Sequence, residues 1–227
     1  EMQLKGKVDM KHFTPSYNPW DQRLCVVPDG DLFKILRTGK ASVETDQIEK
    51  FTETGIQLKS GKHLDADIIV SATGLEIQIM GGIKATVDNK PLNTSEHMLY
   101  NGVMVSDVPN MAMVIGYVNA SWTLKVDVVA DYICRLFNFM DQKGYDEVIA
   151  PTDHSAMLEE TVMGEMSSGY IARAADQLPK QGTKAPWMAT HNYLADRKEL
   201  KNARFDDGIL KFHKRSAEDN RKPKLVS

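Results

Sequence analysis

An apolar stretch that leads through a short polar loop into a long amphipathic helix limits most strongly what this chain can fold into. The stretch VPNMAMVIGYV covers residues 108–118 and predicts a buried strand. The segment NASWTLKVDVVADYICRLFNFMDQKG follows, and its apolar side chains recur every four residues, which predicts a helix with one broad apolar face. These side chains are Leu124, Val128, Tyr132, Leu136 and Met140, with Val129, Ile133 and Phe137 widening the face.

The ends of this helix are also predicted by the sequence. Asn119 or Ser121 is the expected N-cap, and Gly144 is the expected C-terminal stop. A helix N-terminus that follows a strand presents free N–H groups and a partial positive charge, which bind phosphates or the electron-rich edge of a cofactor ring. The pattern by itself favours the alternative, an ordinary strand–helix unit without a ligand.

Other segments carry weaker local signals. Residues 41–71 read as short strands joined by the turns ETG and KSGK, and DIIV (67–70) predicts a buried strand of a parallel sheet. The sequence VSATGL follows, and its Gly74 indicates either a plain turn or a close approach of the backbone. Helices are expected in SAMLEETVMGEM, SGYIARAADQL and THNYLADRKELKNARF.

Composition excludes several classes of protein. The 227 residues are 42% hydrophobic and 26% charged, the balance of a soluble globular protein, and the net charge of −3 argues against a nucleic-acid binder. The chain has no run of eighteen apolar residues, so no membrane span is expected. Cys25 and Cys134 are expected to be free, buried thiols in a reducing compartment. The six histidines lack metal-ligand spacing, and no G-x-S-x-G motif indicates a serine hydrolase.

Arg23 lies in YNPWDQRLCVVPDGDLF, a segment (17–33) rich in proline, tryptophan and aspartate. A guanidinium held there could bind a negative charge in a bidentate way. The alternative is an ion pair with Asp21 or Asp29, and the residues alone favour that alternative.

Four stretches, in order, cover most of residues 12–190 and resemble the flavin-dependent Baeyer–Villiger monooxygenases and the related flavin-containing monooxygenases. They are HFTPSYNPWDQRLCVVPDGDLF, TDQIEKFTETGIQLKSGKHLDADIIVSATGL, VPNMAMVIGYVNASWTLKVDVVADYICRL and SSGYIARAADQLPKQGTKAPW. The resemblance implies an oxidoreductase of the cytoplasm that uses FAD, NADPH and O2. Its substrate would be a small molecule, a ketone, a sulfide or an amine.

The resemblance also implies roles for individual residues. Arg23 matches the family's catalytic arginine, which stabilises the anionic oxygenated flavin and the nicotinamide, and Trp20 belongs to the wall beside it. Thr73 and Gly74 match the motif where the chain passes between the nicotinamide and flavin domains. The segment expected nearest the flavin comprises Asn119, Ala120, Ser121, Trp122 and Thr123. Core packing is an equal alternative for Trp122.

The chain departs from the family because it has neither of the two G-x-G-x-x-G phosphate loops. It therefore resembles the C-terminal part of an α/β flavoprotein with two dinucleotide-binding domains, built from partial Rossmann-like sheets, β-hairpins and C-terminal helices. Residues 1–72 would end the nicotinamide-binding domain, 73–150 would belong to the FAD-binding domain, and 151–227 would form a helical extension and tail. The expected partner is the missing N-terminal half or a complementing chain. The alternative functions are a non-catalytic binding module and a partner subunit.

Overall fold

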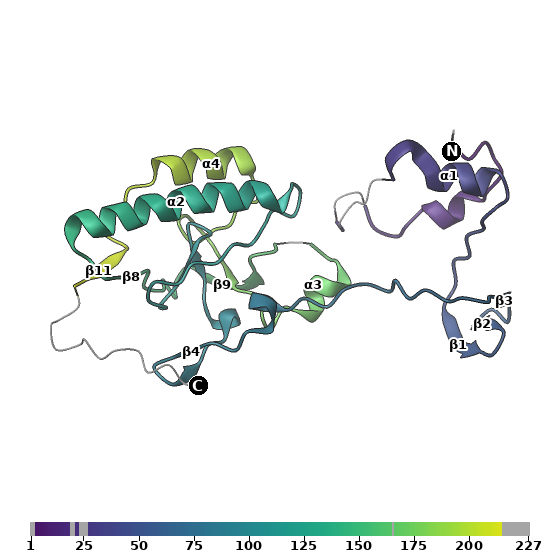
Figure 1. The fold of residues 1–227 in the computed structure, drawn as a ribbon, viewed down its shortest axis with the longest axis horizontal. Coiled ribbons are helices and arrows are strands. Elements are labelled where there is room, and N and C mark those ends of the chain that lie inside the picture. Colours follow the sequence, from purple (N-terminus) through teal and green to yellow (C-terminus); the bar gives the residue numbers. More distant parts are fainter. Residues whose placement is uncertain (1–2, 19–20, 23–26, 165, 215–227) are drawn as a thin grey trace. The chain divides into compact units, whose positions relative to one another are not determined.

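A computed structural model describes residues 3–18, 21–22, 27–164 and 166–214. The chain divides into two compact units, Glu1–Leu75 and Glu76–Ser227, whose elements are drawn in Figure 1. Each unit has its own secondary structure. Among the helices of the described ranges, none is both long and apolar enough to cross a lipid bilayer.

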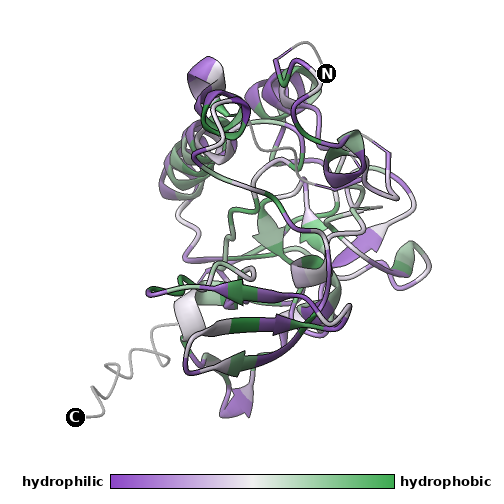
Figure 2. Ribbon diagram, turned by 90° about the vertical axis from the view of Figure 1, so that its right-hand side faces the viewer, coloured by the Kyte–Doolittle hydropathy of each residue, from purple (hydrophilic) through white to green (hydrophobic). Residues whose placement is uncertain are grey.

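The first unit contains one short helix and one small sheet. Two 3-10 turns, Met10–Phe13 and Pro28–Gly30, precede α1 (Asp31–Arg37). The sheet is an antiparallel meander of β1 (Ile48–Thr52), β2 (Gly55–Leu58) and β3 (His63–Asp65). Figure 2 shows this sheet toward the viewer, with both apolar and polar residues along its strands. The hairpins predicted at ETG and KSGK are therefore confirmed.

Gly55 is required where β2 begins. Its φ is 153°, and a Cβ built there would lie 2.0 Å from the carbonyl oxygen of Leu64 on the neighbouring strand β3. Any side chain at position 55 would push β2 and β3 apart, so the turn from β1 into β2 depends on this glycine.

The prediction of a buried strand at residues 67–70 is wrong for this structure. Ile68 and Val70 are each 82% exposed, and the segment has no regular secondary structure. A buried parallel strand needs hydrogen-bonded neighbours along its edges. In the part of the chain that the structure describes, no strand pairs with this segment.

The second unit is organised around two helices. Helix α2 (Trp122–Lys143) and helix α4 (Tyr193–Asn202) lie side by side (Figure 1). Four short antiparallel pairs accompany them: β4 (Thr86–Val87) with β5 (Lys90–Pro91), β6 (Leu99–Tyr100) with β7 (Met104–Val105), β8 (Glu147–Ile149) with β11 (Lys211–His213), and β9 (Met157–Thr161) with β10 (Lys180–Gly182). The remaining elements are α3 (Gly169–Arg173) and the 3-10 turns Ile79–Gly82 and Thr94–Glu96.

Helix α2 forms where the periodicity predicts it. Its fully buried apolar side chains, Val129, Tyr132, Leu136 and Met140, follow one another at spacings of three or four and form one face against the core. Gly144 ends the helix with a left-handed φ of 65°, and its N–H bonds to the carbonyls of the last turn. Ser121 is the N-cap residue, so both predicted ends are confirmed.

Aromatic rings join α2 to the end of the chain. The ring of Tyr132 meets that of Phe205 edge-on at 5.3 Å, and Phe139 packs against Phe205 and Phe212 at 5.5 and 5.3 Å. Phe205 follows α4 and Phe212 lies in β11. These contacts close the core between the two helices and the β8–β11 pair.

Three further predictions in this unit are wrong. Residues 108–118 form no buried strand, since only Ala112 makes a bridge, to Met104, and Val114 is exposed. The segment SAMLEETVMGEM contains strand β9 rather than a helix, because pairing with β10 overrides its helical propensity. Cys134 is exposed on α2 rather than buried.

The mixed α/β class is confirmed by this arrangement of helices and small sheets. Among the described residues, all six pairings between named strands are antiparallel. The Rossmann-like sheets stay a prediction. The same holds for the assignment of chain segments to a nicotinamide and a flavin domain.

Candidate functional site

The N-terminal end of α2, here called the α2 mouth (residues 119–123), lies at the surface: Ala120 is partly buried and the other four residues are exposed. Ser121 has an extended backbone, and its hydroxyl makes no capping bond to the helix amides that the structure describes. The Ser121 hydroxyl lies instead 2.7 Å from the Thr123 hydroxyl. The first turn of α2 carries no acidic side chain. The free N–H groups and positive end of the helix dipole are thus left without an internal anion.

Trp122 forms one wall of the α2 mouth. A Cβ built on Gly116 would lie 2.1 Å from Cγ of the Trp122 ring, so the indole packs directly on the backbone at position 116. Only glycine permits this approach. The Trp122 side chain nevertheless remains 51% exposed, which makes it a surface residue and not a core residue.

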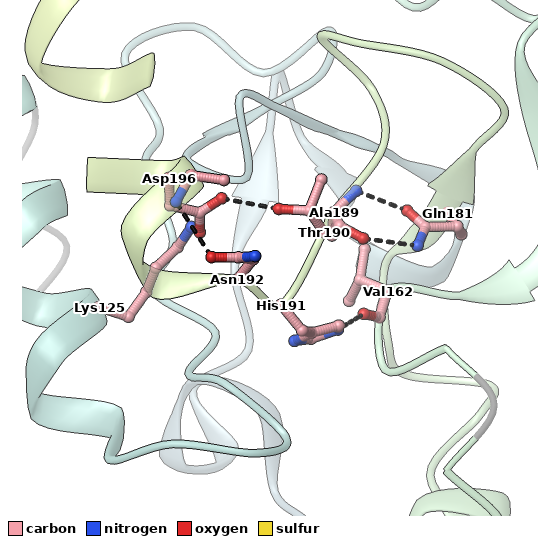
Figure 3. A network of polar contacts seen from close by, with 9 residues as sticks. Lys125, Val162, Gln181, Ala189, Thr190, His191, Asn192 and Asp196 are labelled. Atoms are coloured by element: carbon pink, nitrogen blue, oxygen red, sulfur yellow. Dashed lines mark hydrogen bonds and ion pairs between the residues drawn. The ribbon is translucent and has the colours of Figure 1, made fainter. Parts of the chain in front are cut away.

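A buried ion pair lies one turn inside the mouth. Lys125 Nζ is 2.5 Å from Asp196 Oδ2 of α4, and both side chains are almost fully removed from solvent. The Thr190 hydroxyl donates to the other oxygen of Asp196 at 3.0 Å. Figure 3 shows these groups converging between the two helices. Because both oxygens of the Asp196 carboxylate have partners, its buried negative charge is compensated.

Asn192 fixes the start of α4 and thereby the position of Asp196. The Asn192 side chain accepts a hydrogen bond from the Ala195 amide at 3.1 Å, and its carbonyl accepts one from the Asp196 amide at 2.9 Å (Figure 3). Asparagine is a strong N-cap because its side-chain oxygen satisfies a free amide of the first turn. The cap therefore aims the carboxylate at Lys125.

Tyr117 covers the ion pair from the loop before α2. Its ring lies 5.4 Å from Lys125 Nζ, a cation–π distance, and meets the ring of Tyr193 edge-on at 6.1 Å. The Tyr117 hydroxyl is buried and has no hydrogen-bond partner within the described part of the chain. Burial, together with the negative charge of Asp196, raises the pKa of Tyr117, so the phenol stays protonated.

His191 lines the same region and is held in one tautomer. Its Nε2 lies 2.6 Å from the carbonyl oxygen of Val162, so Nε2 carries the proton and donates it (Figure 3). Burial lowers the pKa of His191. The backbone of His191 is left-handed, with φ of 48°, a conformation that asparagine also adopts readily.

The lowered pKa of His191 predicts a loss of stability in acid. As the pH falls below about 6.5, the unfolded chain binds a proton that the folded chain excludes, so the free energy of unfolding falls, by at most about 1.4 kcal/mol per pH unit. In the His191→Asn variant, the drop in Tm between pH 7.5 and pH 5.5 should be smaller than in the wild type. His154 is exposed, and the His154→Asn variant should behave as the wild type does; equal pH slopes in all three proteins would contradict the prediction.

Two small cavities flank the ion pair. One, of about 20 Å³, is bordered by Tyr117, Thr190 and His191, and the other, of about 30 Å³, by Asn101, Pro186 and Glu199. Each is large enough for about one water molecule, whereas a cofactor pocket measures several hundred Å³. A flavin ring therefore does not fit into either of these two cavities, whereas the five residues of the α2 mouth lie at the surface or are only partly buried.

The residues predicted from the sequence fall into three groups. Trp20 and Arg23 lie outside the described residues. Thr73 and Gly74 belong to the first unit, where both are exposed and Gly74 has a φ of 120° with open space around it. The five residues from Asn119 to Thr123 lie together at the α2 mouth. The φ of Gly74 lies in the range that favours glycine, and the roles of Thr73 and Gly74 stay a prediction.

Sequence reasoning missed Lys125 and Asp196. Lys125 stands on the buried face of α2, four residues before Val129, and a lysine on an apolar face needs an anionic partner. That signal was available in the sequence. The partner of Lys125 could not be predicted, because Asp196 is 71 positions further along the chain.

Comparison with known proteins supplies the wider context. No protein-family model matches the chain, and no solved structure matches it. The chain is 78% identical, over its whole length, to the probable FAD-binding monooxygenase AlmA of Acinetobacter baylyi, and it covers 46% of that protein. It is 51% identical, over 91% of its length, to the FAD-containing monooxygenase EthA of Mycobacterium tuberculosis, of which it covers 42%.

The chain corresponds to a C-terminal portion of the FAD-containing monooxygenases. It spans about half the length of the curated relatives that it matches. The resemblance to flavin monooxygenases is thus confirmed, and so is the expectation that the match covers only part of such an enzyme. The α2 mouth lies within the matched region.

Proposed function

We propose that this chain forms the part of a FAD- and NADPH-dependent monooxygenase that presents the α2 mouth to the flavin and carries the catalytic Arg23. The complete enzyme would insert one oxygen atom of O2 into a ketone, or add it to a sulfur or nitrogen atom. One observation carries the proposal. An uncapped helix N-terminus, walled by a half-exposed tryptophan, occurs in a chain that is 78% identical to a protein named as FAD-binding.

The residues of the α2 mouth fit an electron-rich ring. Ala120 and Ser121 are small and allow a flat group to approach the backbone. The first N–H groups of α2 have no acidic neighbour in the first turn, so they favour negative charge by about 0.3–1 kcal/mol at an exposed site. The exposed part of Trp122 offers an apolar surface beside them.

The chain's own groups would then act by orientation and charge. The chemistry that FAD supplies when bound is acceptance of a hydride from NADPH and activation of O2. The amides at the start of α2 would stabilise negative charge that develops beside them, and Trp122 would exclude water. The Lys125–Asp196 pair would keep the mouth rigid by fastening the first turn of α2 to α4.

Arg23, Thr73 and Gly74 complete the proposal. A guanidinium at position 23 would stabilise the negative oxygen that attacks the substrate, since a preorganised cation in a dry site needs little reorganisation. Trp20 would form part of the wall beside it. Thr73 and Gly74 would lie at the passage from the nicotinamide-binding part (1–72) into the FAD-binding part (73–150), ahead of the extension formed by 151–227.

A hybrid enzyme tests this function. The residues that precede the matched region in the Acinetobacter baylyi relative would be joined to this chain. The purified hybrid should be yellow, oxidise NADPH and transfer oxygen from O2 to a cyclic ketone or a thioether. A hybrid that melts cooperatively but holds no flavin would contradict the proposal and favour a binding module. Flavin binding by the chain mixed with the separate N-terminal part would favour a two-chain enzyme.

A further inference from the structure

Helix α2 carries a second apolar stripe that the described residues of the second unit leave largely exposed. Its members, here called the α2 flank, are Trp122, Val126, Ala130, Ile133 and Phe137. At 3.6 residues per turn, they lie within about 80° of one another around the helix axis. Trp122, Val126 and Phe137 are 51%, 47% and 58% exposed, Ala130 is also exposed, and Ile133 is partly buried.

The α2 flank extends the buried face of the helix. Val129 and Leu136 are buried on one side of it, whereas Asp127, Asp131 and Asn138 are exposed on the opposite side of the helix. Apolar residues that are exposed singly are ordinary. A stripe that runs for four turns beside a buried face is not, because soluble monomers rarely expose a contiguous apolar surface of this extent. The apolar arc of α2 is thus wider than the surface that the described residues of the second unit cover.

An open groove adjoins the Phe137 end of the flank. It has a volume of about 510 Å³ and is lined by Phe137, Met140 and Tyr145 together with the polar residues Asn110, Asp141 and Asp146. A hollow with one apolar wall beside an apolar stripe can receive side chains from a second surface. The flank and the groove together therefore offer a continuous docking surface along α2.

We propose that the α2 flank is the surface on which the N-terminal portion of the full-length protein packs. The relatives are about twice as long as the matched region, so more than half of such a protein lies outside this chain. The flank carries no charged side chain, so its partner surface must be apolar. An intramolecular partner also explains how so much apolar surface can persist, since it would be buried as soon as the protein folds.

The position of the flank supports this occupant over a second copy of the chain. Trp122 belongs both to the flank and to the α2 mouth, and the phosphate-binding loops that a FAD enzyme needs are absent from this sequence. A segment that supplies those loops to a cofactor at the mouth must reach the start of α2. The requirement that the phosphate-binding loops reach the start of α2 rests on the proposed function. The exposed stripe and the length of the relatives do not depend on that function.

The test compares substitutions in the hybrid enzyme with the same substitutions in the 227-residue chain. In the hybrid, Val126→Glu should lower Tm by about 5 °C or more, because it buries an unpaired charge. In the chain alone, the same change should leave Tm nearly unchanged and reduce light scattering. Asn138 is exposed and lies about 120° from Val126 around the helix axis. Asn138→Glu is therefore the matched control and should change Tm little in both proteins.

A labelling experiment gives a second readout that does not require a destabilising change. A maleimide should react with Val126→Cys at least ten times more slowly in the hybrid than in the chain alone, as measured on the corresponding peptide by mass spectrometry. Asn138→Cys should react at similar rates in both. Equal labelling of position 126 in the two proteins would overturn the proposal, as would equal effects of Val126→Glu and Asn138→Glu on the hybrid. Protection that depends on protein concentration would instead assign the flank to a second copy. None of these readouts measures flavin, so the proposed function can fail independently.

Discussion

Replacing Asp196 by leucine should lower the free energy of unfolding by about 3–5 kcal/mol, because it leaves the Lys125 ammonium group buried without an anion. The Lys125 side chain is 7% exposed and that of Asp196 is 12% exposed, so solvent screens the pair little. For a chain of this size, a loss of that magnitude corresponds to a fall in Tm of about 10 °C. Scanning calorimetry of the Asp196→Leu variant measures it.

Two control variants separate the charge effect from a loss of packing. The double variant Lys125→Met/Asp196→Leu should regain most of the lost stability, because an apolar pair of similar volume needs no compensation. Glu159 pairs with Lys180 at 3.0 Å but is fully exposed, so Glu159→Ala should cost less than about 1 kcal/mol. If Asp196→Leu costs no more than Glu159→Ala, the buried pair does not fasten α4 to α2.

The elements that were predictable from the sequence are those that local interactions determine. Helix α2 follows from its apolar periodicity, and Gly144 ends it because glycine adopts the left-handed conformation without a steric penalty. The hairpins of the first unit follow from short turns between β-branched and aromatic residues. In each case the residues that decide the structure lie within a few positions of one another.

The strands expected at 67–70 and 108–118 show why other parts could not be predicted. An apolar run indicates that a segment needs burial, but a strand exists only where a neighbouring strand pairs with it. Ala112 finds a single partner, Met104, and Ile68 finds none among the described residues. The composition of these segments therefore indicates that they need pairing partners, which the described residues do not provide.

The candidate site also contains one part that local sequence predicts and one part that it does not. The α2 mouth was predictable, because a helix N-terminus after a short polar loop is a local feature. The network around Lys125 was not, because it joins residues from α2, α4 and the loop that carries Thr190. Pairings over such separations depend on the packing of the whole unit, which periodicity does not encode.

Replacing Arg23 by alanine in the hybrid enzyme should reduce the rate of oxygen transfer to substrate by about 10²–10³-fold, the usual effect of removing one preorganised electrostatic group. The reduction of flavin by NADPH should continue at a rate within a few-fold of the wild type, because a hydride acceptor needs no cation at the reacting oxygen. Stopped-flow absorbance measures the flavin reduction, and product analysis measures the transfer. Arg23→Lys keeps the positive charge but lacks the planar, bidentate guanidinium. Its rate of oxygen transfer should therefore lie between those of the wild type and Arg23→Ala.

The two half-reactions separate a catalytic arginine from a structural one. Arg37 donates to the Gln3 carbonyl at 2.9 Å on the surface of the first unit, and Arg37→Ala should leave both half-reactions intact. If Arg23 instead formed a structural ion pair with Asp29, Asp29→Asn would have the same effects as Arg23→Ala. In both variants the FAD content, the Tm and the rates of both half-reactions would then fall together. Loss of oxygen transfer alone, with Asp29→Asn silent, is the pattern expected when the guanidinium acts on the reacting oxygen. Oxygen transfer that survives in Arg23→Ala at a near-normal rate would remove Arg23 from the catalytic machinery.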